Sequence, residues 1–139
     1  MAVTLKVKDL MEKNVVTVDS SSTVADAIKE MLKSNVWSVV VTRRGLPEGV
    51  VTERDLIRRC IAKGLVPDRL PVEEIMSSPL ITIGSDATIR EAMSLMIEKD
   101  IRRLFVVEDG KIVGRVTQGH LFESTLDIMS SISSLSGEL

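Results

Sequence analysis

Along the chain, segments with apolar residues every three or four positions alternate with short runs of β-branched apolar residues. Thr23 has the character of a helix N-cap with Asp26 as its reciprocal partner, and apolar residues then follow at intervals of three and four positions, which is typical of one helix face. Asn35 ends this pattern, and β-branched apolar runs typical of strands come next. The predicted elements are a strand at 15–18, a helix between Thr23 and Asn35, strands at 36–42 and 48–52, and a helix at 53–63 that Gly64 ends.

The same pattern returns at a constant offset, so that residue 5 aligns with residue 70 and residue 61 with residue 126 without a gap. Of the 57 aligned pairs 14 are identical, where typical residue usage gives roughly 3 to 4 by chance. The second set of predicted elements is a strand at 80–83, a helix at 88–99, strands at 103–107 and 111–117, and a helix at 118–130. Two copies are too few for most solenoids. We therefore predict an α/β (α+β) fold of two tandem β-α-β-β-α repeats packed about a pseudo-twofold axis.

The boundaries of the repeats follow from the offset and from the breakers Pro67 and Pro71. We expect repeat 1 at 1–66 and repeat 2 at 67–128, sharing one core because each repeat alone would fold marginally. A Ser-rich C-terminal tail follows at 129–139. Its apolar residues keep a helical spacing, which allows a frayed extension, but we expect the tail to be mobile when it is unpaired.

Composition and charge narrow the class of protein. Apolar residues make up 44% and charged residues 27% of the chain, as in soluble globular proteins. The net charge of −2 gives no general attraction to nucleic acid or acidic membranes. The N-terminus lacks the apolar stretch of a signal peptide, and no segment approaches the ~20 apolar residues that span a bilayer. The single cysteine, Cys60, fits a reducing compartment, so we predict a cytoplasmic protein.

The residues that would support catalysis are few. Cys60 and His120 are the only soft metal ligands, which argues against a metal site within one chain. There is one histidine, no Gly-x-Ser-x-Gly elbow and no evident base partner for a nucleophile. We therefore predict no catalytic residues and no enzyme activity.

The second strand of each copy ends in Gly-x-x-Thr and runs directly into a helix. In the first copy Gly49 lets the backbone come close to a neighbour, Thr52 offers a hydroxyl at a helix start, and Asp55 lies one turn later. A carboxylate in that place can accept both hydroxyls of a ribose, but Thr-x-x-Asp is also a plain capping box, and both interpretations remain open. The second copy keeps Thr117 and has His120 in the place of Asp55, so the box is broken while the junction is kept.

The combined pattern resembles a pair of CBS domains, together called a Bateman module, over about residues 5–126. The resemblance rests on four motifs, V-x-x-[LI]-M, h-T-h, T-[VI]-x-x-A and G-h-V-T-x-x-[DH]-L, which recur in both copies except that Arg115 takes the h position of the last motif in the second copy. It implies binding of AMP, ADP, ATP or S-adenosylmethionine in the cleft between the copies, and a regulatory signal to a partner protein. It also implies a homodimer, for which the helices at 88–99 and 118–130 would supply apolar faces.

The resemblance implies two related sites. The first would use Thr52 and Asp55 for the ribose and phosphate, with the adenine pocket and its neighbours at Met76, Ser77, Pro79, Ile81, Ile101 and Arg102. The second would use Thr117 and His120 on the ribose side and Met11, Val16 and Val36 on the base side. Basic residues for phosphate match Arg102 and Arg103, whose counterparts are Trp37 and Ser38. Core packing and base stacking both remain open for Trp37.

The two sites differ in sequence at His120 and at Arg115, which stands where the first copy has Val50. Because neutral imidazole offers one acceptor and one donor, whereas a carboxylate accepts two hydroxyls, we expect one tightly bound nucleotide per chain. The second site is expected to be weak, empty or filled by another anion.

A locally basic stretch suggests a rival function, nucleic-acid binding. Its residues are Arg43, Arg44, Arg54, Arg58, Arg59, Lys63 and Arg69. A solvated face is the more common reason for such a run, and no recognition helix or aromatic platform accompanies it. From Val116 to the C-terminus there is no Lys or Arg. This asymmetry could pair basic and acidic ends between protomers.

Overall fold

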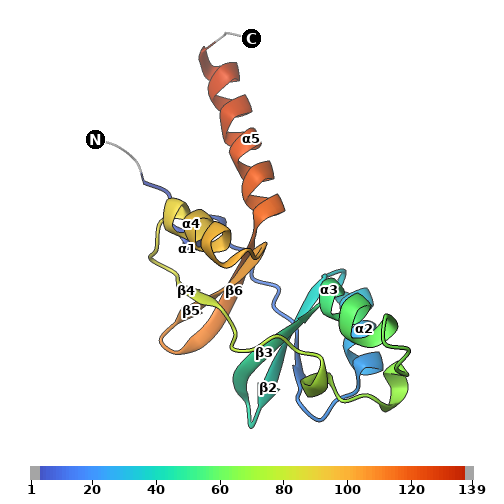
Figure 1. Cartoon of the computed structure of the whole chain (residues 1–139). Coiled ribbons are helices and arrows are strands. Elements are labelled where there is room, and N and C mark those ends of the chain that lie inside the picture. Colours follow the sequence, from blue (N-terminus) through green and yellow to red (C-terminus); the bar gives the residue numbers. More distant parts are fainter. Residues whose placement is uncertain (1–3, 137–139) are drawn as a thin grey trace. The chain divides into compact units, whose positions relative to one another are not determined.

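The computed structural model describes residues 4–136, with side chains as far as residue 134, and it divides into two compact units. The central unit is Val15–Ile81. The terminal unit combines the chain up to Asn14 with the chain from Thr82 onward. Each unit holds a three-stranded sheet with its own helices (Figure 1). The predicted mixed α+β fold with two β-α-β-β-α repeats is confirmed.

The central unit carries the elements of the first repeat and the start of the second. They are β1 (Thr17–Asp19), α2 (Val24–Ser34), β2 (Ser38–Arg43), β3 (Leu46–Thr52), α3 (Glu53–Asp55), a π-helical segment η1 (Leu56–Ile61) and two single 3-10 turns, η2 (Pro67–Arg69) and η3 (Val72–Glu74). In the sheet β2 lies in the middle, parallel to β1 and antiparallel to β3. Figure 1 shows α2 and α3 on the same side of this sheet.

Helix α2 forms where its caps and its apolar spacing predict it. The Thr23 side chain accepts from the Asp26 N–H, and the Asp26 carboxylate accepts from the Thr23 N–H in return, as the sequence indicated. Asn35 ends the helix in the left-handed conformation at φ 51°. The face with Val24, Ala27 and Met31 is buried in the core. The apolar face of α2 therefore packs in the same core as the buried residues Val39 and Val41 of β2 and Val51 of β3.

The helix after β3 differs from the sequence-based expectation. The spacing predicted one continuous helix over 53–63, whereas the structure has a single α-helical turn followed by η1. In η1 the Ala62 N–H donates to the carbonyl of Ile57 at 2.8 Å, which is an i→i+5 bond. Apolar spacings of three and four positions fit either kind of helix, so the pattern could not distinguish them. Gly64, at φ +67°, follows the end of the helix as predicted.

The terminal unit carries the second repeat together with the first residues of the chain. Its elements are α1 (Val7–Leu10), β4 (Thr82–Gly84), α4 (Ile89–Lys99), β5 (Arg103–Glu108), β6 (Lys111–Thr117) and α5 (Gln118–Ser136). The sheet has the same order and strand directions as the first, with β5 in the middle. Among residues 4–136 no helix is both long enough and apolar enough to cross a membrane.

Helix α5 is longer than expected. The predicted helix ended at Ser130, but the structure continues it to Ser136, so the expectation that the chain leaves the helix at 130 is wrong. The physical reason lies in the sequence, because residues 120–136 contain no Gly or Pro and keep apolar residues at helical spacing. Residues 137–139 of the predicted tail lie outside the described chain.

The opening segment of each repeat pairs with the sheet of the other repeat. Val50 on β3 and Ser77 form an antiparallel bridge, and Arg115 on β6 forms the matching bridge with Glu12. A Cβ atom at Gly49 would lie 2.6 Å from the Ser77 carbonyl oxygen, so only glycine allows this approach. The sequence had indicated a close approach at Gly49, and the structure shows that the neighbour is the protein's own backbone.

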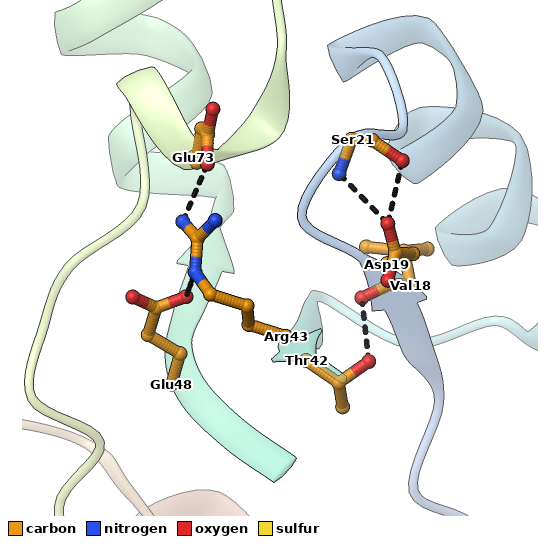
Figure 2. A network of polar contacts seen from close by, with 7 residues as sticks. All are labelled: Val18, Asp19, Ser21, Thr42, Arg43, Glu48 and Glu73. Carbon is orange, nitrogen blue, oxygen red and sulfur yellow. Dashed lines mark hydrogen bonds and ion pairs between the residues drawn. The ribbon is translucent and has the colours of Figure 1, made fainter. Parts of the chain in front are cut away.

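Ion pairs hold both opening segments beside their sheets. In the central unit the guanidinium of Arg43 contacts Glu48 at 2.8 Å and Glu73 of η3 at 2.5 Å (Figure 2). In the terminal unit Lys8 of α1 contacts Asp86 at 3.0 Å, and this hydrogen bond raises the pKa of Lys8 and lowers that of Asp86. Lys8 and Glu73 occupy equivalent positions in the two opening segments, but Arg43 is the last residue of β2 whereas Asp86 lies in the turn after β4. Since these groups are exposed, each pair contributes little stability.

Candidate functional site

The junction between β3 and α3 contains the two residues that the sequence singled out. The Thr52 N–H donates to Asp55 Oδ2 at 2.9 Å, and the Thr52 hydroxyl donates to the same oxygen at 3.2 Å. The Thr52 oxygen also accepts from the Asp55 N–H at 3.4 Å. The capping box that the spacing allowed is therefore present in the structure. The contact of Asp55 with a ribose stays a prediction, because the capping box neither requires nor prevents it.

The Asp55 carboxylate has a further partner that the capping box does not require. Its Oδ1 atom accepts from the Ser77 hydroxyl at 3.0 Å, and the Nε atom of Arg59 lies 3.9 Å from the same oxygen. Only 5% of Asp55 is exposed. Both carboxylate oxygens thus have protein donors, and a ligand hydroxyl would replace one of them or use a remaining lone pair.

Arg59 fixes the segment that carries Ser77. Its Nη1 atom donates to the carbonyl of Ile75 at 3.1 Å and to that of Met76 at 2.9 Å. The sequence placed Arg59 only in the basic stretch, because nothing in the local pattern relates it to residues 16 and 17 positions later. The structure makes it a positioning residue for the segment beside Asp55.

Several predicted ligand-binding residues lie together in the central unit. Val50 is bridged to Ser77, and the sulfur of Met76 lies close to Gly49. Ser38 stands directly opposite Thr52 in the sheet and is buried. The remaining predicted residues of this unit are Val16, Val36, Trp37, Pro79 and Ile81. Pro79 is exposed, whereas Val16 and Ile81 are half-buried.

Trp37 belongs to a different surface from Thr52 and Asp55. It lines an apolar groove of about 260 Å³ within the central unit, together with Val36, Met31, Leu56 and other residues of α2 and η1. Neither Thr52 nor Asp55 lines this groove. Trp37 itself is 64% exposed. Both core packing and base stacking therefore stay predictions for Trp37.

The other predicted residues belong to the terminal unit, where the β6–α5 junction repeats the arrangement with different groups. The Thr117 hydroxyl accepts from the His120 N–H at 3.1 Å. Arg103 stands opposite Thr117 in the sheet, and the Arg102 carbonyl accepts from the first residue of α5. Ile101 and Met11 are half-buried in the same unit.

Glu12 and Asn14 also belong to this junction, and the sequence did not indicate either of them. Arg115 Nη2 lies 3.6 Å from Glu12 Oε2 and 3.4 Å from Asn14 Oδ1. The Nδ1 atom of His120 lies 4.0 Å from Glu12 Oε1. Glu12 and Asn14 precede Arg115 by about a hundred positions, so only the fold reveals the contact. Arg115 is therefore beside a carboxylate and an amide oxygen, not isolated.

Metal ligands do not gather at either junction. In the described part of the chain no three His, Cys, Asp or Glu side chains come together in a way that could hold a metal ion. Cys60 is a buried free thiol whose sulfur lies 3.5 Å from the Leu65 carbonyl.

Comparison with known proteins gives consistent results for the whole chain. The family model for the CBS domain matches residues 7–62 and again 72–127. An uncharacterized protein of Methanopyrus kandleri is 35% identical over 121 residues, which cover 86% of this chain and 62% of that relative. The chain thus spans less than two thirds of the length of that protein.

Solved structures show the same similarity in three dimensions. An uncharacterized conserved protein from Pyrococcus horikoshii superposes with a TM-score of 0.82 at 36% identity, covering 90% of this chain and 95% of that one. A hexameric CBS-CP12 protein from bloom-forming cyanobacteria superposes with a TM-score of 0.81 at 28% identity, covering 87% and 68%. With the two matched repeats, the two sheets and these relatives, the chain belongs to the CBS-domain family and carries a pair of CBS domains.

Proposed function

We propose that this CBS-domain pair is a non-catalytic regulatory module that binds an adenosine-containing compound and signals to a partner protein. CBS pairs generally serve in regulation and ligand binding. The observation that carries the proposal is the junction of β3 and α3, where Thr52, Asp55 and Ser77 place two hydroxyls around one buried carboxylate. Such a group of polar atoms at the end of a strand suits the hydroxyls of a ribose.

The chemistry around this junction supports a nucleoside in particular. Val50, Met76 and Ile81 supply half-buried apolar surface from the same unit, which suits the flat face of a base. The proposed ligands are AMP, ADP, ATP and S-adenosylmethionine, which share the adenosine group that this surface would contact. Arg102 and Arg103 are the proposed phosphate partners on the basis of their match to the family pattern.

A thermal-shift experiment tests the ligand class. The full chain is melted with AMP, ADP, ATP, S-adenosylmethionine and a short DNA duplex, each over a range of concentrations. A ligand at 100 times its Kd stabilises the fold by about 2.7 kcal/mol. Thr52→Val, which removes the hydroxyl and keeps the shape, should reduce the shift. If no adenosine compound changes the melting of the wild-type chain, the proposed function is wrong.

The duplex in this experiment tests the alternative, nucleic-acid binding by the basic stretch. Two residues of that stretch have internal partners: Arg43 contacts Glu48 and Glu73, and Arg59 donates to backbone carbonyls. These contacts favour a structural use of both arginines. A duplex that stabilises the chain when the nucleotides do not would favour the alternative.

Self-association is part of the proposal. Large apolar side chains are exposed on the helices of both units, among them Leu32, Ile61, Ile97 and Phe122. Covering them would remove apolar surface from water, and the related CBS-CP12 protein is described as hexameric. We propose a homodimer formed through these helices.

Sedimentation velocity tests the dimer with a matched control. Phe122→Asp and Leu32→Asp place a charge on the helical surfaces and should produce monomers. Leu46→Asp changes an equally exposed leucine at the β2–β3 turn and should leave the association state unchanged. A monomeric wild-type chain, or equal effects of all three changes, would contradict a helix-mediated dimer.

A further inference from the structure

Helix α5 continues beyond the second CBS repeat. The family match ends at residue 127, whereas α5 extends to Ser136. Figure 1 shows this helix leading away from the strands of its own unit, and every residue from 126 to 132 is exposed. A helical segment shorter than about 12–15 residues is marginal in water without tertiary contacts. A neighbour from outside the unit would therefore stabilise this end of α5.

The exposed end of α5 carries a line of apolar residues. The members of this line are separated by steps of four, three and four positions: Leu121, Thr125, Ile128 and Ile132. This is the spacing at which two helices pack side by side along their length. Leu121 is buried in the terminal unit, whereas Ile128 and Ile132 are 38% and 60% exposed. The line, which we call the α5 seam, thus begins in the core and continues along the exposed part of the helix.

The hydroxyl groups beside the seam already have partners within the helix. The Thr125 hydroxyl donates to the Leu121 carbonyl at 2.8 Å, and the Ser131 hydroxyl donates to the Asp127 carbonyl at 3.0 Å. Such bonds to the preceding turn satisfy the hydroxyl donor locally. A second helix can therefore cover these two side chains without leaving their donors unpaired.

The charged residues of α5 lie away from the seam. The helix has no Lys or Arg, and its carboxylates are Glu123 and Asp127. At about 100° per residue, both carboxylates fall on the half of the helix that faces away from the seam. A basic partner would therefore meet no acidic group along the seam, whereas an equally uncharged apolar face suits it. The α5 seam of a second copy is such a face, and pairing leaves the acids of both copies on the outer sides, where their repulsion is small.

We propose that the end of α5 pairs with the same end of α5 in a second copy of the chain, along the α5 seam. This pairing rests on the proposed homodimer, because so short a seam holds two chains only when other surfaces already bring them together. It adds to that dimer a contact from residues that lie outside the matched repeats.

Sedimentation velocity over a range of concentrations tests the pairing with a matched control. Ile128→Asp, Ile132→Asp places two charges on the seam and should raise the dissociation constant of the dimer by roughly tenfold or more, because two large apolar side chains no longer pack. Ser130→Asp, Ser134→Asp adds the same charges at the same spacing on the opposite side of the helix, and should leave the dissociation constant almost unchanged. All four positions are exposed, and circular dichroism checks that both variants keep their fold.

Disulfide formation gives a second measurement that keeps the seam apolar. Cysteine behaves as a small hydrophobic residue, so Ile128→Cys, Ile132→Cys retains an apolar seam. This variant should cross-link two copies under mild oxidation whether the helices run parallel or antiparallel. Ser130→Cys, Ser134→Cys should cross-link far less, because its thiols point away from the partner. The wild-type chain, whose single cysteine Cys60 is buried, provides the baseline.

The outcomes separate this pairing from the dimer on which it rests. If the wild-type chain is a monomer at every concentration, the proposed dimer is wrong and the pairing falls with it. If the wild-type chain dimerises and Ile128→Asp, Ile132→Asp dimerises equally well, the dimer stands and the pairing is refuted. Equal cross-linking by the two cysteine variants of a dimeric chain would likewise overturn the seam. Weaker dimerisation in the seam variant alone, with cross-links in the seam cysteines alone, would support it.

Discussion

Replacing Asp55 by alanine should destabilise the chain far more than a simple helix cap would. The carboxylate accepts from the Thr52 N–H, the Thr52 hydroxyl and the Ser77 hydroxyl, and it is nearly fully buried. Alanine removes all three bonds and leaves the donors at a site with little access to water. The change also removes the side-chain hydrogen bond between α3 and Ser77, whose segment the backbone bridge to Val50 still holds.

The magnitude follows from these contacts. A lost N-terminal cap costs about 1 kcal/mol, and a buried donor left without a partner costs about 1–3 kcal/mol. Together they predict a decrease of about 2–4 kcal/mol in the free energy of unfolding. Asp26 supplies a matched control, because it makes the same capping box with Thr23 but is exposed and has no third partner. Asp26→Ala should cost about 1 kcal/mol or less.

Urea unfolding followed by tryptophan fluorescence measures both variants. Trp37 is the only tryptophan and lies in the central unit, between α2 and η1, so it reports on the unit that contains both boxes. The helix propensity gained by alanine is similar in the two variants and cancels in the comparison. The difference between them isolates burial and the bond to Ser77. Equal losses for Asp55→Ala and Asp26→Ala would refute the argument that Asp55 joins two segments.

Three further measurements test other parts of the structure. Arg102→Ala should lower the affinity for AMP more than that for adenosine by calorimetry, because an arginine would meet the phosphate charge, and equal losses would indicate general damage. Asp86→Asn should lower the free energy of unfolding at neutral pH but not at strongly acidic pH. The pKa of Asp86 is lowered in the folded chain, so the stability that its carboxylate contributes is present above the unfolded pKa and is lost as the pH falls through the folded pKa. An effect in urea titrations that does not change with pH would contradict this. Gly49→Ala should destabilise the chain strongly because its Cβ meets the Ser77 carbonyl, whereas Gly84→Ala has open space around it, and comparable melting temperatures would show that the close approach relaxes at little cost.

Much of the fold could be predicted because its signals are local. The Thr23 and Asp26 box and the left-handed Asn35 mark both ends of α2 within a few residues of sequence. The offset between the repeats then transfers the assignment to the second copy. The π-helical segment η1 was missed because its i→i+5 bonds leave no distinct hydrophobic period.

The candidate site was only partly predictable because its contacts join distant segments. Thr52 and Asp55 share a short motif and could be identified from it. Ser77 was assigned to an adenine pocket, and its bond to Asp55 spans 22 positions. Glu12 resembled any surface charge until the backbone bridge placed it beside Arg115. Residues whose role depends on which strand lies next to them require the fold to be known.

The exchange of opening segments between repeats has a consequence for how the nascent chain matures. All of Val15–Ile81 is synthesised before β4, so every strand of the central unit and the opening segment that pairs with β3 precede the sheet of the terminal unit along the chain. Residues 4–14 have no such partner at that stage, because the chain must grow by 101 residues from Asn14 before it contains Arg115. Residues 4–14 are therefore synthesised before the central unit but reach their native neighbours after it. An intermediate of synthesis would combine a folded central unit with an unpaired segment at residues 4–14.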